Sequence, residues 1–231
     1  MSGDILSNWA RTKTGEDADV LFTEAGEKYA EAVKINSDYH EVYNSWGNAL
    51  RNWALKKKGT DADNLPKQAD EKYSEAVKIK PDFHEAFHMW GLTLDAWARR
   101  KEGADADKLF KQADEKFAET VKIRSNDANI YNNWGGMLLW WYRVVSEDRK
   151  DALLKKAINV LLKAETIKEG HATYNLACAY SLLSNDTECL KCLEVSRKTG
   201  NLPKREHLEN DKDLDPIRDK QWFKDFLATL E

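Results

Sequence analysis

Aromatic and apolar residues recur along this chain at spacings of three and four, the period of one face of an α-helix. The same face appears three times at an offset of 44 residues, as Tyr43, Trp46, Leu50 and Trp53, then Phe87, Trp90, Leu94 and Trp97, then Tyr131, Trp134, Leu138 and Trp141. Between residues 52–95 and 96–139, 21 of 44 positions are identical. A fixed offset of this kind predicts an internal repeat built from helices.

Each repeat continues with a second helical pattern, in which small and aromatic residues share one face. Its members are Ala25, Tyr29, Ala32 and Val33, then Ala69, Tyr73, Ala76 and Val77, then Ala113, Phe117, Thr120 and Val121. The 4 prolines and 11 glycines are few and fall near the predicted helix ends, so the sequence predicts an all-α fold.

The boundary between the two helices of a repeat carries its own signals. Basic residues followed by Gly59 or Gly103 predict that the first helix ends at the glycine. The second helix then has Asp61 or Asp63 available as a cap. Because Pro66 fits only in the first turn of a helix, we expect Asp63 to be the N-cap.

These residues resemble the tetratricopeptide repeat (TPR) family. The pattern of that family is filled in order by Tyr43, Trp46-Gly47, Leu50, Ala69, Tyr73, Ala76 and Pro81. The resemblance implies a right-handed α–α superhelix, or solenoid, of TPR-like helix pairs. It also gives Gly47, Gly91 and Gly135 a physical role, since a residue without a side chain lets two helices approach closely.

The repeat length departs from the family pattern, because 44 residues exceed the usual ~34. Elongated units with a Trp-Gly pair also resemble, more weakly, the plant-type mitochondrial outer-membrane import receptor. We expect one solenoid over residues 1–231, made of a partial first unit (1–39), elongated units (40–83, 84–127 and 128–170), an ordinary-length unit (171–203) and a C-terminal cap (204–231).

Composition narrows the classes of partner. A net charge of −4 without a basic cluster argues against nucleic acid. The longest nearly unbroken apolar run, Trp134 to Tyr142, is far shorter than the ~20 residues that span a bilayer, so no membrane insertion is expected. The N-terminal residues lack the basic region followed by an apolar core that a signal peptide has, so no signal peptide is expected. These observations favour a cytoplasmic protein, and association with an organelle surface remains open.

Two motifs suggest metal chemistry. His84, Glu85 and His88 form H-E-x-x-H, which in a zinc metallopeptidase supplies two ligands and a general base. The third ligand position holds Leu94, and His84 and Glu85 repeat His40 and Glu41, so this enzyme remains a remote alternative. The Cys189-x-x-Cys192 pair has no second C-x-x-C and is best explained as buried structural cysteine. No cofactor is expected.

The tryptophans at 46, 53, 90, 97, 134 and 141 recur on the inward face and are expected in the core. In TPR arrays the other face of the first helix lines the concave surface. Here that face is rich in asparagine, whose amide both donates and accepts hydrogen bonds and can hold a peptide backbone. The predicted partner-binding residues are Asn44, Asn48, Arg51, Asn52, Glu85, His88, Asn129, Asn132, Asn133, Trp140, Tyr174 and Asn175.

The sequence therefore predicts a non-enzymatic scaffold that binds an extended segment of a protein or peptide partner. Asn44, Asn48, Asn132 and Asn133 are expected to bond to the backbone of that segment. The family's carboxylate clamp for free C-termini is not expected, because the places of its cations hold other residues, among them Asn129 and Asn133. The alternative is a structural subunit of a larger, multi-protein complex.

Overall fold

The computed structural model describes residues 2–59 and 61–230, of which residue 61 is described by its backbone alone. All regular structure in this part of the chain is helical, so the all-α prediction is confirmed. Residues 1–125 and 126–231 form two compact units. The right-handed sense of the superhelix stays a prediction.

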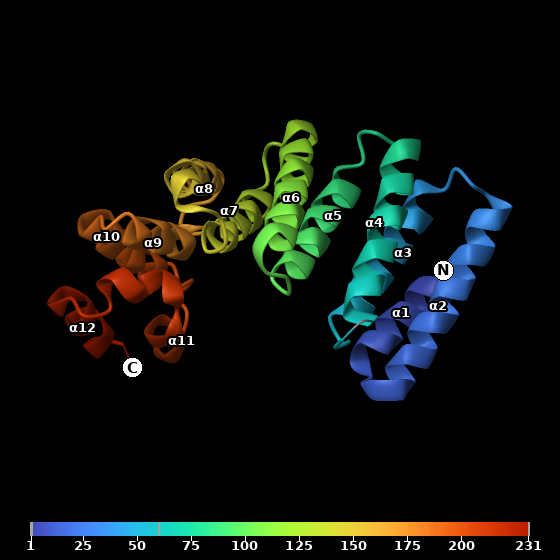
Figure 1. The fold of residues 1–231 in the computed structure, drawn as a ribbon, viewed down its shortest axis with the longest axis horizontal. Coiled ribbons are helices and arrows are strands. Elements are labelled where there is room, and N and C mark those ends of the chain that lie inside the picture. The colour runs from blue at the N-terminus through green and yellow to red at the C-terminus, as the bar shows by residue number, and fades with distance from the viewer. Residues whose placement is uncertain (1, 60, 231) are drawn as a thin grey trace. The chain divides into compact units, whose positions relative to one another are not determined.

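The first unit consists of three helix pairs (Figure 1). They are α1 (Ser2–Thr12) with α2 (Gly15–Ile35), α3 (His40–Ala54) with α4 (Asp61–Ile79), and α5 (His84–Ala98) with α6 (Gly103–Ile123). The leading helices α1, α3 and α5 also contact one another in a row, while α2 packs on α3 and α4 packs on α5. The leading helices therefore share one side of this unit.

The second unit contains two more pairs and a closing segment. The pairs are α7 (Ala128–Tyr142) with α8 (Glu147–Ile167) and α9 (Thr173–Leu182) with α10 (Asp186–Lys198). The closing segment is α11 (Arg205–Asn210), the 3₁₀ helix η1 (Lys212–Ile217) and α12 (Gln221–Ala228). It contributes fully buried Leu208, Leu214, Ile217 and Phe223. That this segment caps the last apolar face of the array stays a prediction.

Close helix crossings occur at the glycines of the Trp-Gly pairs. A Cβ atom added to Gly47 would lie 2.7 Å from the ring of Tyr73, and one added to Gly91 would lie 3.2 Å from Phe117. Tyr73 and Phe117 are themselves fully buried. The expected role of these glycines is therefore confirmed, and Gly3 repeats it against Tyr29.

The helix boundaries within each pair differ from the prediction. The leading helices α3 and α5 end at Ala54 and Ala98, five residues before the glycines expected to end them. Gly59 and Gly103 instead adopt positive φ angles of 68° and 55° at the entry to the second helix. The helix α4 already begins at residue 61, so Asp63 lies inside it and is not the N-cap.

Asp63 instead accepts bonds from the following repeat. The indole Nε1 of Trp97 donates to it at 3.1 Å, and the Lys101 ammonium lies 2.8 Å from it. The same joint, here called the Trp–Lys–Asp joint, forms again at Asp19, with Trp53 at 2.7 Å and Lys57 at 2.5 Å. In the closing segment, Trp222 at 3.2 Å and Lys220 at 2.6 Å reproduce it on Asp186. An indole and an ammonium on one aspartate therefore link successive elements of the array.

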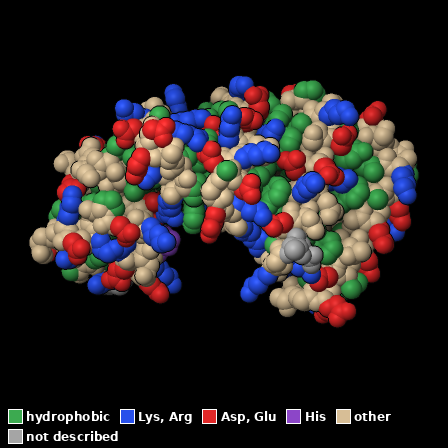
Figure 2. All heavy atoms as spheres, viewed as in Figure 1, with side chains coloured by type: hydrophobic (Ala, Val, Ile, Leu, Met, Phe, Trp, Pro, Cys, Tyr) green, Lys and Arg blue, Asp and Glu red, His purple; other side chains and the backbone are tan. Residues whose placement is uncertain are grey.

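The surface is strongly charged but mixed in sign. On the face shown in Figure 2, acidic and basic side chains are interspersed over both units. Among the described residues, none of the helices is both long enough and apolar enough to cross a bilayer.

Candidate functional site

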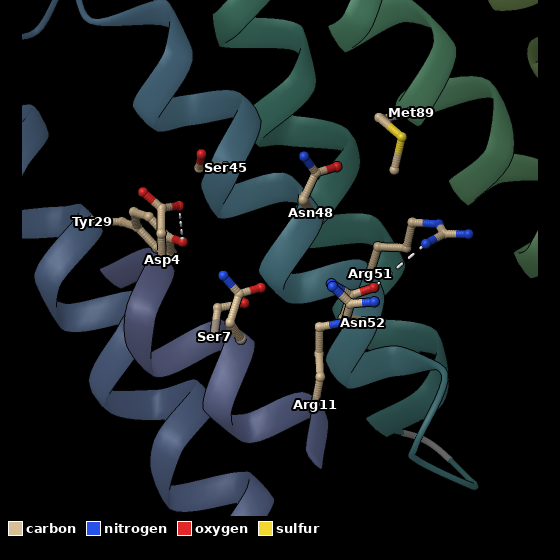
Figure 3. A pocket seen from close by; sticks show the side chains of 10 residues that line it. Asp4, Ser7, Arg11, Tyr29, Ser45, Asn48, Arg51, Asn52 and Met89 are labelled. Carbon is tan, nitrogen blue, oxygen red and sulfur yellow. Dashed lines mark hydrogen bonds between the residues drawn. The ribbon is translucent and has the colours of Figure 1, made fainter. Parts of the chain in front are cut away.

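The first unit contains an open polar pocket of about 300 Å³ between α1 and α3 (Figure 3). We call it the α1–α3 pocket; its lining residues are Asp4, Ser7, Asn8, Arg11, Tyr29, Ser45, Asn48, Arg51, Asn52 and Met89. Nearly every one presents an amide, a hydroxyl or a charge. Such a lining provides many donors and acceptors and little apolar area, which suits a polar ligand such as a peptide backbone.

The pocket forms where leading helices turn the same face outward. Successive leading helices lie side by side, so positions that match at the 44-residue offset, such as Asn8 and Asn52, are brought to the same side. Spacings of three and four residues place Asp4, Ser7, Asn8 and Arg11 on one face of α1.

Asn48 is held in place from behind. Its Oδ1 accepts a hydrogen bond of 2.8 Å from the hydroxyl of the fully buried Tyr73. The amide Nδ2 has no partner among the described residues, which leaves two donors free in the pocket. An anchored oxygen and two free N–H groups make Asn48 a preorganised donor.

Arg51 brings positive charge to the same pocket. Its Nη1 lies 3.5 Å from Oδ1 of Asn52, and its Nε is buried without a hydrogen-bond partner. Burial raises the pKa of the nearby carboxyl of Asp95, against the opposing effects of Arg99 and Arg51. Arg99 already holds Asp95 through two bonds of 2.8 and 2.7 Å, so the guanidinium of Arg51 keeps donors available for a ligand.

At the opposite end of the pocket, a second tyrosine is bonded to a polar side chain of a leading helix. The Tyr29 hydroxyl donates to Asp4 at 2.8 Å. Burial, together with this carboxylate, raises the pKa of Tyr29 above its usual value, so the hydroxyl remains a donor at neutral pH. The pocket thus has a carboxylate near α2 and two guanidinium groups further along.

Three of the predicted partner-binding residues meet in this pocket: Asn48, Arg51 and Asn52. The prediction missed Asp4, Ser7, Asn8, Arg11 and Tyr29. Their signal was in the sequence, because Asp4, Ser7 and Asn8 lie 44 residues before those three groove positions.

Three further predicted residues of the first unit lie outside the pocket lining. Oδ1 of Asn44 is buried without a hydrogen-bond partner. Glu85 pairs with Nδ1 of His84 at 2.6 Å. His88 packs edge-on against the ring of Phe117, with centroids 5.9 Å apart.

In the second unit, asparagines bond to neighbouring scaffold residues. Asn175 donates to Oδ1 of Asn132 at 2.8 Å, which joins α9 to α7. Asn129 accepts from His171 at 2.9 Å and donates to Asp127. Part of the asparagine-rich face therefore holds helices together.

The remaining predicted residues of that unit differ in exposure. Trp140 is 37 % exposed and lies under Arg143, whose guanidinium carbon is 4.3 Å from the ring centroid. Asn133 lies on the same helix, α7, and is part-buried. Tyr174 donates to Asp211 at 2.7 Å and so belongs to the contact with the closing segment.

The H-E-x-x-H motif does not assemble a metal site. Nε2 of His84 accepts from Arg124 at 2.9 Å, and its Nδ1 faces Glu85, so both ring nitrogens have partners. In the part of the chain that the structure describes, no group of three close metal-ligand side chains includes His84 or His88. The geometry gives the zinc peptidase alternative no support.

One cluster does bring three potential metal ligands together, namely Cys178, Asp211 and Asp213. The guanidinium of Arg143 occupies it, donating to Asp213 at 2.9 Å and to Asp211 at 3.4 Å. Burial raises the pKa of the Cys178 thiol, which disfavours the thiolate that binds metals. This cluster fastens η1 to α7 and α9.

The other two cysteines are also buried and free. Burial raises the pKa of Cys189 to about 12 and that of Cys192 to about 11. Both therefore remain thiols at neutral pH, as expected for structural cysteines.

Solved structures that are similar in fold include TPR proteins. Similar ones include MamA, with 18% identity over 79% of this chain and 90% of that chain at a TM-score of 0.58. YrrB, a TPR protein with an unusual peptide-binding site, shares 17% identity over 84% of each chain, with a TM-score of 0.55. TTC0263 of Thermus thermophilus shares 15% identity over 87% of this chain and 89% of that chain, with a TM-score of 0.52. No protein-family model matches the sequence, and a comparison with curated proteins gave no match.

Proposed function

We propose that this chain, which has the fold of tetratricopeptide repeat proteins, is a non-enzymatic interaction module that binds an extended segment of a partner protein in the α1–α3 pocket. The observation that carries the proposal is Asn48. Its oxygen is anchored by Tyr73, and its two N–H donors face an open polar pocket. A donor held in this way loses little side-chain entropy when it binds a carbonyl group.

An extended peptide matches the remaining chemistry of the pocket. Its backbone offers alternating carbonyl and amide groups, which the amides of Asn8, Asn48 and Asn52 can pair without reading a particular sequence. The peptide-binding site reported for YrrB, which has a similar fold, supports a peptide as the ligand class. In the second unit, we propose that Trp140, Asn133 and the Asn132–Asn175 pair contact a protein partner.

The proposal is tested by site-specific photo-crosslinking. A photoreactive amino acid at Ser45, which lines the pocket, should crosslink to a linear segment of one partner in extract from the native source. The matched control position is Asn64, which is exposed on α4 and lies outside the pocket. Equal crosslinking from both positions, or crosslinks scattered over many proteins, would count against the pocket.

A substitution then isolates the donor role of Asn48. Asn48→Asp keeps an oxygen for the Tyr73 hydroxyl but removes both N–H donors. We expect it to weaken capture of the crosslinked segment roughly tenfold, because a lost hydrogen bond leaves the carbonyl of the ligand unpaired. Asn64→Ala should leave capture unchanged. Full retention of binding in the Asn48→Asp protein would show that this amide does not hold the ligand.

A further inference from the structure

On α1, the tryptophan and the lysine of a Trp–Lys–Asp joint are both present, but no aspartate accepts from them among the described residues. Trp9 and Lys13 lie 44 residues before Trp53 and Lys57, which together hold Asp19. Trp9 is 53 % exposed, and the Lys13 ammonium lies 5.7 Å from its ring centroid. Among the described residues, none supplies a carboxylate to this pair.

The residue one turn before Trp9 is likewise more exposed than its counterparts in the other leading helices. Ile5 is 66 % exposed, whereas the residues at its position in α3 and α5, Ala49 and Thr93, are only 3 % and 2 % exposed. We call Ile5, Trp9 and Lys13 the α1 outer face. It is separate from the α1–α3 pocket, which uses Asp4, Ser7, Asn8 and Arg11 of the same helix.

We propose that the α1 outer face docks an amphipathic helix of a partner protein through an aspartate that accepts from Trp9 and pairs with Lys13. The internal joint at Asp19 defines the rest of the ligand. Phe22, three residues after that aspartate, stacks on Trp53 with ring centroids 5.8 Å apart at an interplanar angle of 16°. Ala18, the residue directly before Asp19, is buried.

The docking helix therefore carries a small residue, an aspartate and, three positions after the aspartate, a large apolar side chain. Residues three apart lie on the same face of a helix, so the carboxylate and the apolar group meet the α1 outer face together. Lys13 adds charge complementarity to the apolar area of the exposed Trp9 ring.

The aspartates that occupy the joint positions of this chain are not available to a second copy. Asp19, Asp63 and Asp186 each already hold a tryptophan and a lysine of their own chain. The equivalent aspartate of the next repeat, Asp107, is also engaged. The proposed partner helix therefore brings an aspartate of its own.

A synthetic helix provides the direct test. The probe is a fluorescein-labelled peptide with the α2 sequence, residues 15–35, stapled between the exposed positions 24 and 28. The staple is needed because most of the stability of a helix in a protein comes from tertiary packing, which the isolated peptide lacks. Binding to the full chain is followed by fluorescence anisotropy. We expect saturable binding that falls roughly tenfold when the peptide carries Asp19→Asn or the protein carries Trp9→Ala.

Further variants separate this joint from nonspecific adhesion. Ile5→Ala gives α1 the residue found in the internal joint, so it should bind the peptide at least as tightly. Leu162→Ala removes another exposed large apolar side chain and should leave binding unchanged. The proposal is overturned if neither the natural chain nor the Ile5→Ala protein binds the peptide. It is also overturned if the affinity is unchanged by Asp19→Asn in the peptide and by Trp9→Ala in the protein.

Discussion

Replacing Gly47 with alanine tests whether the close crossing of α3 and α4 is required for stability. In a helix interior, Gly→Ala alone stabilises by about 1 kcal/mol. Against this gain stands steric overlap, because the new Cβ would lie 2.7 Å from one ring atom of Tyr73 and 2.9 Å from two others. Overpacking of a well-packed site costs about 1–3 kcal/mol.

The upper part of that range applies at Gly47, because Tyr73 has no room to move. Its ring is fully buried, and its hydroxyl is bonded to Asn48. We therefore expect Gly47→Ala to lower the free energy of unfolding by about 1–2 kcal/mol after the propensity gain. Gly91→Ala should cost less, since its Cβ would lie 3.2 Å from Phe117.

Gly26 provides the matched control within α2. A Cβ there would meet only Nε1 of Trp46, at an ordinary 3.6 Å, so Gly26→Ala should stabilise by about 1 kcal/mol. The assay is denaturant unfolding of the full chain, followed by far-ultraviolet circular dichroism. If Gly47→Ala and Gly26→Ala shifted stability in the same direction, the argument from close packing would be refuted.

Two further predictions concern titratable groups. The Lys101 ammonium lowers the pKa of Asp63, so the contribution of this joint is complete above the ordinary carboxyl pKa and is lost as pH falls through the lowered folded value. Asp63→Asn should cost up to about 1 kcal/mol at neutral pH, reduced by exposure, and progressively less as the pH falls. Denaturant midpoints measured across the pH range would contradict this if the difference between the two proteins stayed constant. Because burial raises the pKa of Cys189 to about 12 and that of Cys192 to about 11, alkylation by iodoacetamide at pH ~8 should be slow until the chain unfolds. Rapid labelling of either cysteine in the folded protein, measured by mass spectrometry, would show that the site is open.

The helix pairs and their packing could be predicted because they depend on positions close in sequence. The 44-residue offset identified Tyr73 and Phe117 as core residues, and both are fully buried. Asp63 was misassigned for the opposite reason. An aspartate after a glycine suits a helix cap, but its partners Trp97 and Lys101 lie 34 and 38 residues further along the chain.

The site could be predicted only as a face of the leading helices. Periodicity identifies which side of a helix an asparagine occupies, but not whether its amide is satisfied by a neighbour. Asn132 and Asn175 are 43 residues apart and bond to each other, whereas the amide nitrogen of Asn48 has no partner in the described part of the chain. That difference depends on how adjacent pairs meet, which sequence spacing does not specify.

Comparison of the repeats with one another links the α1–α3 pocket to the core behind it. The position of Asn48 holds Asp4, Leu92 and Gly136 in the other units, while the position of Tyr73 holds, in the same order, Tyr29, Phe117 and Leu161. A tyrosine hydroxyl therefore occurs only where the leading helix presents a polar side chain, and in both cases the two are bonded at 2.8 Å. A phenylalanine would satisfy packing against the glycine equally well, as Phe117 does against Gly91. The hydroxyls of Tyr29 and Tyr73 are thus best explained by the polar groups that they orient, which favours the first two repeats as the place where the proposed partner binds.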